Sequence, residues 1–389
     1  MKTKKNRKHI CIVATVPFVI KWFMKPHIVS LKDKYDISLV SSGSGKELGD
    51  LLDDSVSFHS LQIDRKISFK NDVVALFKLW YFFRKQKFDC VHSIMPKSGL
   101  LAMLAARMAR VPFRFHTFTG QVWANKTGLS RFLLKLLDKV LAMNASLVLA
   151  DSHSQRKFLL ENNIVTPHSI IVLADGSIAG VDVNRFQYSA SVRTQLRNEL
   201  KIGRNAVVFL FLGRLNKDKG LMDLSQAFKT TAQYNENVHL LVVGPDEDGL
   251  EFEFSELARY FPGRVHRVVG FTDCPENYMS AADVFCLPSY REGFGMVIIE
   301  AGAIGLPAIA SRIYGITDAV VDGKTGILHQ PTSDKEISEA MLFLAKNDKL
   351  RHRMGAAARD RAINKFSEEQ VSQALLGFYR KMFSRCGAS

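Results

Sequence analysis

Cysteine is scarce in this sequence of 389 residues, and the few cysteines form no recognisable pattern. Their number is odd and no two stand in a C-x-x-C pair, which argues against a disulfide framework and against a zinc site. We therefore expect a protein that works in a reducing, cytoplasmic compartment. The five cysteines are Cys11, Cys90, Cys274, Cys286 and Cys386.

Long hydrophobic runs are missing as well. An uncharged run at residues 10–20 follows a basic start, but it is shorter than the roughly 20 residues that a membrane helix needs. Lys21, Trp22 and Phe23 follow the run, where a signal peptide would have a small-x-small cleavage site. The sequence predicts a buried first strand here, and no segment that spans a bilayer.

Acidic residues are few in the first half of the chain. Residues 1–185 hold 28 Lys and Arg against 14 Asp and Glu, whereas residues 186–389 hold 25 against 24. The net charge of +15 therefore comes almost entirely from the first half, which predicts an anionic partner there. Nucleic acid and an anionic membrane are the candidates, and a merely soluble basic surface is the alternative. Because no nucleic-acid recognition motif occurs, we expect the inner face of the cytoplasmic membrane.

Short apolar runs alternate with helix-period segments along the whole chain, without internal repeats. This alternation predicts parallel sheets covered on both faces. We expect an α/β protein of two doubly wound, Rossmann-like domains, residues 1–185 and 186–389, facing a central cleft, with a last helix able to return to the first domain. The expected strands are 10–16, 37–40, 89–92, 113–117, 145–150, 206–212, 238–243, 265–269, 284–287 and 307–310, and the clearest helices are 71–87, 98–110 and 129–143.

The segment at 209–220 combines a strand end with a basic loop. Gly213 permits a tight turn, and a helix is expected to begin near Gly220. Arg214 offers a planar fork that matches two phosphate oxygens, and Lys219 adds a charge beside the helix N-terminus. The segment predicts an anion site, with a solvated basic loop as the alternative.

The segment at 287–302 carries two carboxylates in a glycine-rich setting. Gly293 and Gly295 leave backbone N–H groups open to a ligand at a helix start. Glu292 and Glu300 would lie about 12 Å apart in a continuous helix, which suits a sugar nucleotide held at both ends. The apolar neighbours of Glu300 predict a buried environment for it, and an ordinary helix carboxylate is the alternative.

These motifs resemble those of family 4 retaining glycosyltransferases of the GT-B fold. The resemblance covers Gly213-Arg-Leu-x-x-x-Lys-Gly220, Glu292-x7-Glu300, and the stretches 281–289 and 320–328. Residues 117–124 and 313–318 are similar to bacterial enzymes of O-antigen, capsule and glycoprotein-glycan assembly. Such enzymes commonly use undecaprenyl-diphosphate-linked acceptors, so the resemblance implies a nucleotide-sugar donor, a UDP-sugar carrying a hexose or N-acetylhexosamine, and a lipid-linked saccharide acceptor.

The resemblance implies a role for each matching residue. Arg214 and Lys219 hold the donor diphosphate, Glu300 holds the ribose, and Glu292 holds the transferred sugar. His116, at the end of a strand in the first half, contacts the donor sugar and the acceptor side. The implied catalytic residues are His116, Glu292, Arg214 and Lys219, and the implied donor-binding residues are Gly213, Arg214, Lys219, Glu292, Gly293, Phe294, Gly295, Met296 and Glu300.

Two features depart from the family pattern, and a third feature bears on metal binding. The loop after the first expected strand, residues 14–20, lacks the usual glycine pair, and residues 243–245 read Val-Gly-Pro where a further glycine often stands. Asp246 and Asp248 form an Asp-x-Asp that could hold a metal, but the resemblance puts that loop near the base. We therefore expect no metal and no cofactor, with charge on the leaving diphosphate met by Arg214 and Lys219.

Two helices of the first half mix basic and apolar residues. Arg131, Lys135 and Lys139 recur at a spacing of four beside several leucines, and residues 77–87 combine five aromatic with four basic side chains. Such helices can lie in a lipid headgroup layer, or they can simply pack on a sheet. Two other functions stay open, a UDP-sugar epimerase of the same fold and, with less support, a nucleic-acid-binding module.

Overall fold

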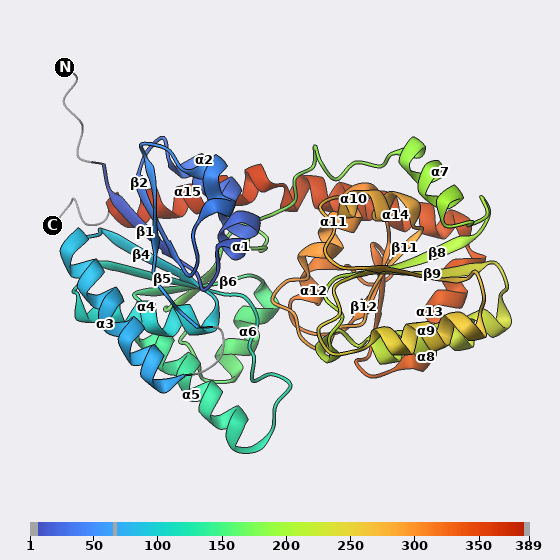
Figure 1. Ribbon diagram of the computed structural model, residues 1–389, viewed down its shortest axis with the longest axis horizontal. Coiled ribbons are helices and arrows are strands. Elements are labelled where there is room, and N and C mark those ends of the chain that lie inside the picture. Colours follow the sequence, from blue (N-terminus) through green and yellow to red (C-terminus); the bar gives the residue numbers. More distant parts are fainter. Residues whose placement is uncertain (1–6, 65–67, 385–389) are drawn as a thin grey trace. The chain divides into compact units, whose positions relative to one another are not determined.

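The computed structural model describes residues 7–64 and 68–384 and divides the chain into two compact units. Unit 1 comprises residues 1–179 and 368–389, and unit 2 comprises residues 180–367. Each unit has a parallel sheet of its own, as the sequence predicted (Figure 1). Four of the cysteines have free thiols, and Cys386 lies outside the described residues.

Unit 1 is built on a seven-stranded sheet in the order β3-β2-β1-β4-β5-β6-β7, with every neighbouring pair parallel. The central strands β1 and β4 are buried on both faces, so β1 is apolar after His9, whereas β4 also buries His92 and Ser93. The strands are β1 (His9–Val13), β2 (Asp36–Ser41), β3 (Val56–Ser60), β4 (Cys90–Ile94), β5 (Phe113–Phe118), β6 (Leu147–Ala150) and β7 (Ile170–Val172).

The helices of unit 1 include the three that the sequence predicted most clearly, now α3, α4 and α5. The glycine-free segment after β1 becomes helical at Pro17, and a π-helical turn at Ile20–Met24 lies between α1 and α2. Among the described residues, no helix is both long and apolar enough to cross a membrane. The helices are α1 (Pro17–Val19), α2 (Lys25–Leu31), α3 (Phe69–Gln86), α4 (Pro96–Met108), α5 (Gly128–Asn144), α6 (His153–Glu161) and α15 (Glu368–Ser384), with a 3-10 helix at Lys46–Leu51.

Unit 2 has a six-stranded parallel sheet in the order β10-β9-β8-β11-β12-β13. Its strands are β8 (Val207–Leu212), β9 (Val238–Gly244), β10 (Val265–Val269), β11 (Val284–Leu287), β12 (Ala308–Ser311) and β13 (Gly326–His329). Its helices are α7 (Ala190–Glu199), α8 (Leu221–Tyr234), α9 (Glu251–Tyr260), α10 (Pro275–Ala281), α11 (Met296–Ile304), α12 (Ile316–Ala319), α13 (Asp334–Lys346) and α14 (Asp348–Phe366), with a 3-10 turn at Lys217–Lys219.

The last helix, α15, returns to unit 1 and packs against α2. Its Tyr379 hydroxyl lies 2.6 Å from Nδ1 of His92, and its Ser372 hydroxyl lies 3.0 Å from Nδ1 of His27. His27 donates from Nε2 to the carbonyl of Ile178 at 2.6 Å, because a carbonyl can only accept. All four of these side chains are buried, so residues from the C-terminal helix complete the buried interior of unit 1.

Two of the buried histidines of unit 1, His27 and His92, make it sensitive to acid. Burial lowers the pKa of His27 to about 4 and that of His92 to about 3, the latter also because His27 is near. In the unfolded chain both would titrate near pH 6.5, so between these values the unfolded state binds more protons. The stability that these two neutral histidines contribute is therefore fully present above about pH 6.5. It is lost as the pH falls toward the pKa values of the folded state.

We predict that His92→Asn reduces this acid sensitivity. Between about pH 7.5 and about pH 5.5 the variant should lose about 1.4 kcal/mol less unfolding free energy than the wild type, because one titrating group is gone. Urea unfolding followed by tryptophan fluorescence measures this, since Trp22, Trp80 and Trp123, the three tryptophans of the sequence, all belong to unit 1. His352→Asn, at an exposed histidine of α14, is the control and should leave the pH dependence unchanged. Equal pH dependence in His92→Asn and wild type would contradict the assignment.

Candidate active site

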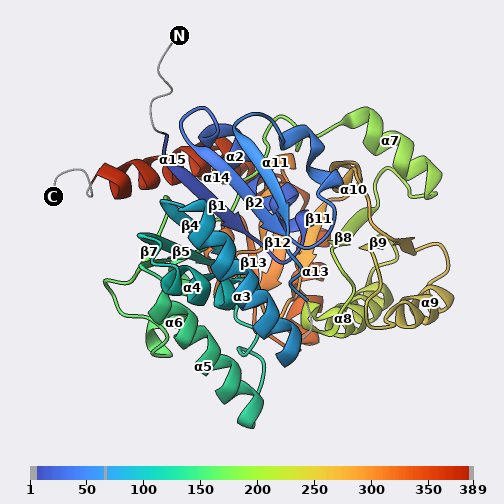
Figure 2. The same cartoon turned by 60° about the vertical axis from the view of Figure 1, so that its left-hand side comes forward.

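The carboxyl edge of the second sheet contains a topological switch point. Strands β8 and β11 are neighbours, and from them the strand order runs outward in opposite directions (Figures 1 and 2). In doubly wound sheets, ligands bind in the crevice outside the carboxyl ends of such strands. Both basic and acidic motifs found in the sequence follow these two strands directly, so they meet at this edge.

The loops after β8 and β11 touch through their backbones. Gly220 adopts a left-handed conformation with φ of 64°, and a Cβ atom there would lie 2.0 Å from the carbonyl oxygen of Pro288. The N–H of Tyr290 donates to the carbonyl of Asp218 at 2.8 Å. Because α8 begins just after Gly220 and α11 begins at Met296, two helix N-termini lie at this edge. Such termini favour an anion.

Lys219 and Glu292, two of the predicted site residues, form an ion pair between these loops. Both side chains are largely withdrawn from solvent. Ser289 donates its hydroxyl hydrogen to the same carboxylate oxygen of Glu292 at 2.9 Å, and Arg291 pairs with Asp218 at 2.8 Å. The pair therefore has a fixed geometry at the start of both helices.

Arg214 lies on the same loop as Lys219 and also has a carboxylate partner. Its Nη1 donates to both oxygens of Glu247, at 3.0 and 2.8 Å, and Asn216 donates to one of them at 3.2 Å. Glu247 follows β9, the other neighbour of β8. Sequence reasoning assigned no role to Glu247; the signal that could have revealed it is its position in the loop after β9, three residues beyond the carboxyl end of that strand.

Four further predicted donor-binding residues, Gly293, Phe294, Gly295 and Met296, lie around the start of α11. Gly213 directly follows β8, Gly293 lies in the loop before α11, and Gly295 precedes its first residue, Met296. Phe294 is buried and meets the ring of Phe366 edge-on, with the ring centroids 5.0 Å apart. Its side chain therefore anchors the loop in the core, which leaves its backbone as the part available to a ligand.

Glu300 lies on α11, one turn before the helix ends. The sequence predicted a buried environment for it, but the carboxylate-bearing residue is only partly buried, because the apolar stripe of α11 faces the core beside it. The helix also begins four residues after Glu292, so the two glutamates are joined by loop and helix rather than by one continuous helix.

His116 belongs to unit 1, in the second half of β5. Its ring is fully buried, packs against Gly99 at the start of α4, and shares a 2.9 Å hydrogen bond between Nδ1 and the Ser93 hydroxyl. The other ring nitrogen, Nε2, is buried and has no hydrogen-bond partner among residues 7–64 and 68–384. Burial lowers the pKa of His116 to about 3, with His92 adding to the shift, so the imidazole is neutral at physiological pH.

Asp246 and Asp248, the one metal candidate of the sequence, are engaged in the turn before α9. Asp246 accepts hydrogen bonds from the N–H groups of Leu250 and Glu251, at 3.0 and 2.8 Å, and Asp248 accepts from Lys217 at 2.8 Å. Burial raises the pKa of Asp246, but these N–H groups outweigh it, so the pKa lies below its ordinary value. Within the described ranges no three His, Cys, Asp or Glu side chains gather as metal ligands would.

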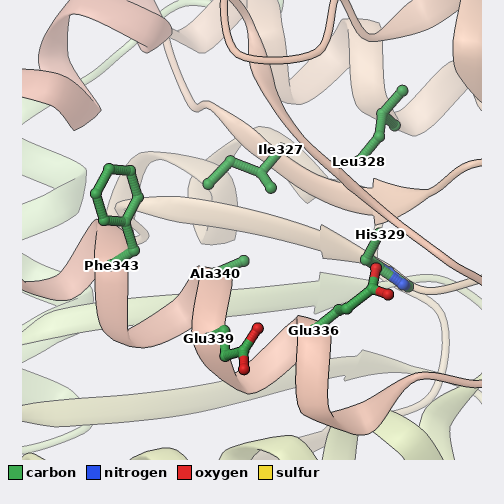
Figure 3. Close-up of a pocket in the computed structure, with 7 residues that line it drawn as sticks. All are labelled: Ile327, Leu328, His329, Glu336, Glu339, Ala340 and Phe343. Carbon is green, nitrogen blue, oxygen red and sulfur yellow. The ribbon is translucent and has the colours of Figure 1, made fainter.

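A hollow of about 290 Å³ lies elsewhere on unit 2, between β13 and α13. Figure 3 shows its ring of residues, with His329 and Glu336 at one end and Phe343 at the other. None of its lining residues is a lysine or an arginine, so it offers a phosphate no cation. The edge of β8 and β11 is therefore the better candidate for an anionic ligand.

Two family models match the chain, one in each part. The model "Glycosyl transferase 4-like domain" matches residues 30–176, and "Glycosyl transferases group 1" matches residues 192–361. The second match contains the loops after β8 and β11, with Arg214, Lys219 and Glu292.

The relatives span nearly the whole chain. A capsular polysaccharide biosynthesis glycosyltransferase, CapM of Staphylococcus aureus, is 30% identical over 380 residues, which is 97% of each chain. A UDP-Gal:alpha-D-GlcNAc-diphosphoundecaprenol alpha-1,3-galactosyltransferase of Escherichia coli is 28% identical over 86% of each chain.

The fold also matches solved structures. The Anabaena protein HepE, crystallised with UDP and glucose, superposes with a TM-score of 0.79 at 18% identity, over 96% of this chain and 100% of that one. At that identity the match speaks for the fold alone. Together with the two family models and the near-complete match to the capsular enzyme, it identifies the chain as a family 4 glycosyltransferase of the GT-B fold.

Proposed function

We propose that this glycosyltransferase moves a hexose or N-acetylhexosamine from a UDP-sugar onto an undecaprenyl-diphosphate-linked saccharide during surface glycan assembly. The observation that carries the proposal is the cluster of Arg214 and Lys219 beside two helix N-termini at the switch point of the second sheet. Cations and helix N-termini together suit a diphosphate. The names of the capsular and diphosphoundecaprenol relatives support the donor and acceptor classes.

The reaction is proposed to proceed with retention. The bond between the anomeric carbon and the diphosphate oxygen breaks, and a bond from the acceptor hydroxyl oxygen forms on the same face of the sugar. The acceptor proton passes to the leaving phosphate, and UDP departs. Arg214 and Lys219 stabilise the negative charge that grows on the diphosphate as the bond breaks, which is how fixed charges lower such barriers.

Other residues have proposed roles in holding the donor. Glu300 accepts hydrogen bonds from the ribose hydroxyls, and Glu292 with the backbone from Gly293 to Met296 holds the transferred sugar. His116 contributes its unpaired Nε2 on the acceptor side. Because Asp246 already caps the turn before α9 and Asp248 already accepts from the backbone of Lys217, we propose that no metal takes part.

We further propose that unit 1 binds the anionic inner face of the cytoplasmic membrane through what we call the α3/α5 surface. Figures 1 and 2 both show α3, α4 and α5 on one side of the first sheet, and α4 packs against the other two. The exposed apolar side chains of this surface are Phe69, Val73, Val74, Phe77 and Tyr81 of α3 and Leu129, Phe132, Leu133, Leu136, Leu137 and Met143 of α5. Its exposed cations are Lys70, Lys78, Arg84, Lys85 and Lys139.

The outward face of α5 is apolar, and two of its three predicted membrane cations point elsewhere. Arg131 and Lys135 lie over the buried ring of Trp123, at 5.4 and 5.7 Å from its centroid. Trp123 in turn donates to Asp138 at 2.7 Å. The cations therefore stabilise the inner side of the helix, and the contact with lipid would depend on apolar insertion flanked by Lys139.

The direct test of the function is transfer from a panel of UDP-sugars to a polyprenyl-diphosphate-linked sugar, with products identified by mass spectrometry. We expect one product that gains a single sugar in α- or β-linkage matching the donor anomer, both with and without EDTA. Conversion of the UDP-sugar to its epimer without any acceptor would instead identify an epimerase. Loss of transfer on chelation, restored by Mg²⁺ or Mn²⁺, would overturn the metal-independent mechanism.

Arg214→Ala should lower turnover roughly 100-fold or more, because a charge that stabilises the leaving diphosphate is removed. The ion pair of Arg214 is exposed, so circular dichroism should remain that of the wild type. Arg259→Ala removes an exposed arginine from α9 of the same unit and should have little effect. Steady-state kinetics of both variants decide the matter, and undiminished turnover in Arg214→Ala would remove this residue from the diphosphate site.

Phe132→Ser combined with Leu136→Ser should release the protein from anionic liposomes. At about 1 kcal/mol for each partly inserted side chain, affinity should fall roughly thirtyfold. The control replaces two exposed aromatic residues of α9 in unit 2, Phe252→Ser with Tyr260→Ser, and should bind liposomes as the wild type does. Co-sedimentation at low salt measures both. Equal loss in the two double variants would mean that binding is not specific to the α3/α5 surface.

A further inference from the structure

The best-placed cation for a diphosphate is already paired with a carboxylate. Arg214 holds both oxygens of Glu247 through one nitrogen, Nη1, and Asn216 donates to the same carboxylate. Lys219 is likewise paired, with Glu292. In the ligand-free protein the two proposed phosphate cations are therefore neutralised, and a diphosphate would add negative charge beside two carboxylates.

The chain fixes Glu247 in this position by backbone contacts. Its N–H donates to the carbonyl of Leu215 at 2.9 Å, and the N–H of Leu215 donates to Pro245 at 2.8 Å. Gly244, which directly precedes Pro245, has φ of 141°. A Cβ atom there would lie 1.9 Å from the carbonyl oxygen of Gly213. The loops after β8 and β9 are thus joined at the residues that flank Arg214.

The neighbours of Glu247 leave it as the one acid of its loop directed to Arg214. Asp246 caps the turn before α9, and Asp248 accepts from the backbone of Lys217. Among the described residues, the carboxylate that contacts the guanidinium of Arg214 is that of Glu247, which accepts hydrogen bonds with both oxygens. The competition for Arg214 therefore comes from a single side chain that rotation can withdraw.

We propose that Glu247 competes with the nucleoside diphosphate for Arg214 and so sets the affinity for donor and product. The carboxylate gives up the guanidinium when the diphosphate binds and takes it back as the product leaves. The proposal rests on the proposed function, because it takes Arg214 to be a diphosphate ligand. In the opposite role, Glu247 would orient Arg214 for the phosphate, and its replacement would weaken the binding of UDP rather than tighten it.

The experiment measures the dissociation constant of UDP by calorimetry for the wild type, Glu247→Gln, Arg214→Ala and the double variant. Glu247→Gln should bind UDP roughly fivefold more tightly, the factor that the upper range of an exposed ion pair represents. In the Arg214→Ala background the same substitution should change the affinity little, because the contested cation is gone. Product inhibition by UDP should strengthen in parallel in Glu247→Gln.

Glu256→Gln is the matched control. Glu256 pairs with Arg259 on α9, and its side chain is 40% exposed, against 38% for Glu247. The substitution removes the same charge from the same unit and should leave UDP affinity unchanged apart from general electrostatics. Glu247→Ala, checked for a native circular dichroism spectrum, guards against an effect particular to glutamine and should also bind more tightly.

The outcomes separate the inference from the function on which it rests. If the wild type does not bind UDP, the proposed donor is wrong. If it binds UDP and Arg214→Ala weakens binding, while Glu247→Gln and Glu247→Ala bind no more tightly than the wild type, the competition is overturned and the donor site stands. An equal gain in Glu256→Gln would also overturn it, since the effect would then follow net charge.

Discussion

The contact between Gly220 and the carbonyl of Pro288 is the constraint on which the candidate site depends. No side chain fits between them, so the loop after β8 and the loop after β11 meet backbone to backbone. Because the loops lie this close, Lys219 forms an ion pair with Glu292, and α8 and α11 begin at the same edge of the sheet. A residue with a Cβ at this position would push the two loops apart and separate Lys219 from Glu292.

The charges that we propose to bind the diphosphate also stabilise one another in the ligand-free site. Lys219, half-buried, would be costly to leave unpaired, and Glu292 removes that cost in the absence of a diphosphate. Arg214 is more exposed, so its pair with Glu247 contributes less stability and opens more readily. The two ion pairs therefore differ in exposure, and we expect an anion to displace the more exposed pair, Arg214 and Glu247, more easily.

The sequence was sufficient for the parts of the structure that follow from local pattern. Central strands and the helices α3, α4 and α5 appear near their predicted positions, because buried parallel strands are continuously apolar and amphipathic helices are periodic. Edge strands β3, β7 and β13 were missed: each is only three to five residues long, and β3 and β13 also contain polar residues. Periodicity also cannot tell which stripe of α5 faces inward; only tertiary contact decides that Arg131 and Lys135 lie over Trp123. The partner of Arg214 was missed for a similar reason, because it follows a strand about 30 residues further along the chain.

Unit 1 is discontinuous in sequence, and this sets an order on its folding. The hydrogen bonds of His92 to Tyr379 and of His27 to Ser372 join residues that are 287 and 345 positions apart. Each histidine would be a buried polar group without one of its partners until α15 arrives, which is costly. Unit 2 is one continuous segment between the two parts of unit 1, so it can complete its own core first. The hydrogen bonds of His27 and His92 thus make the stability of the N-terminal part of unit 1 depend on the C-terminal helix α15.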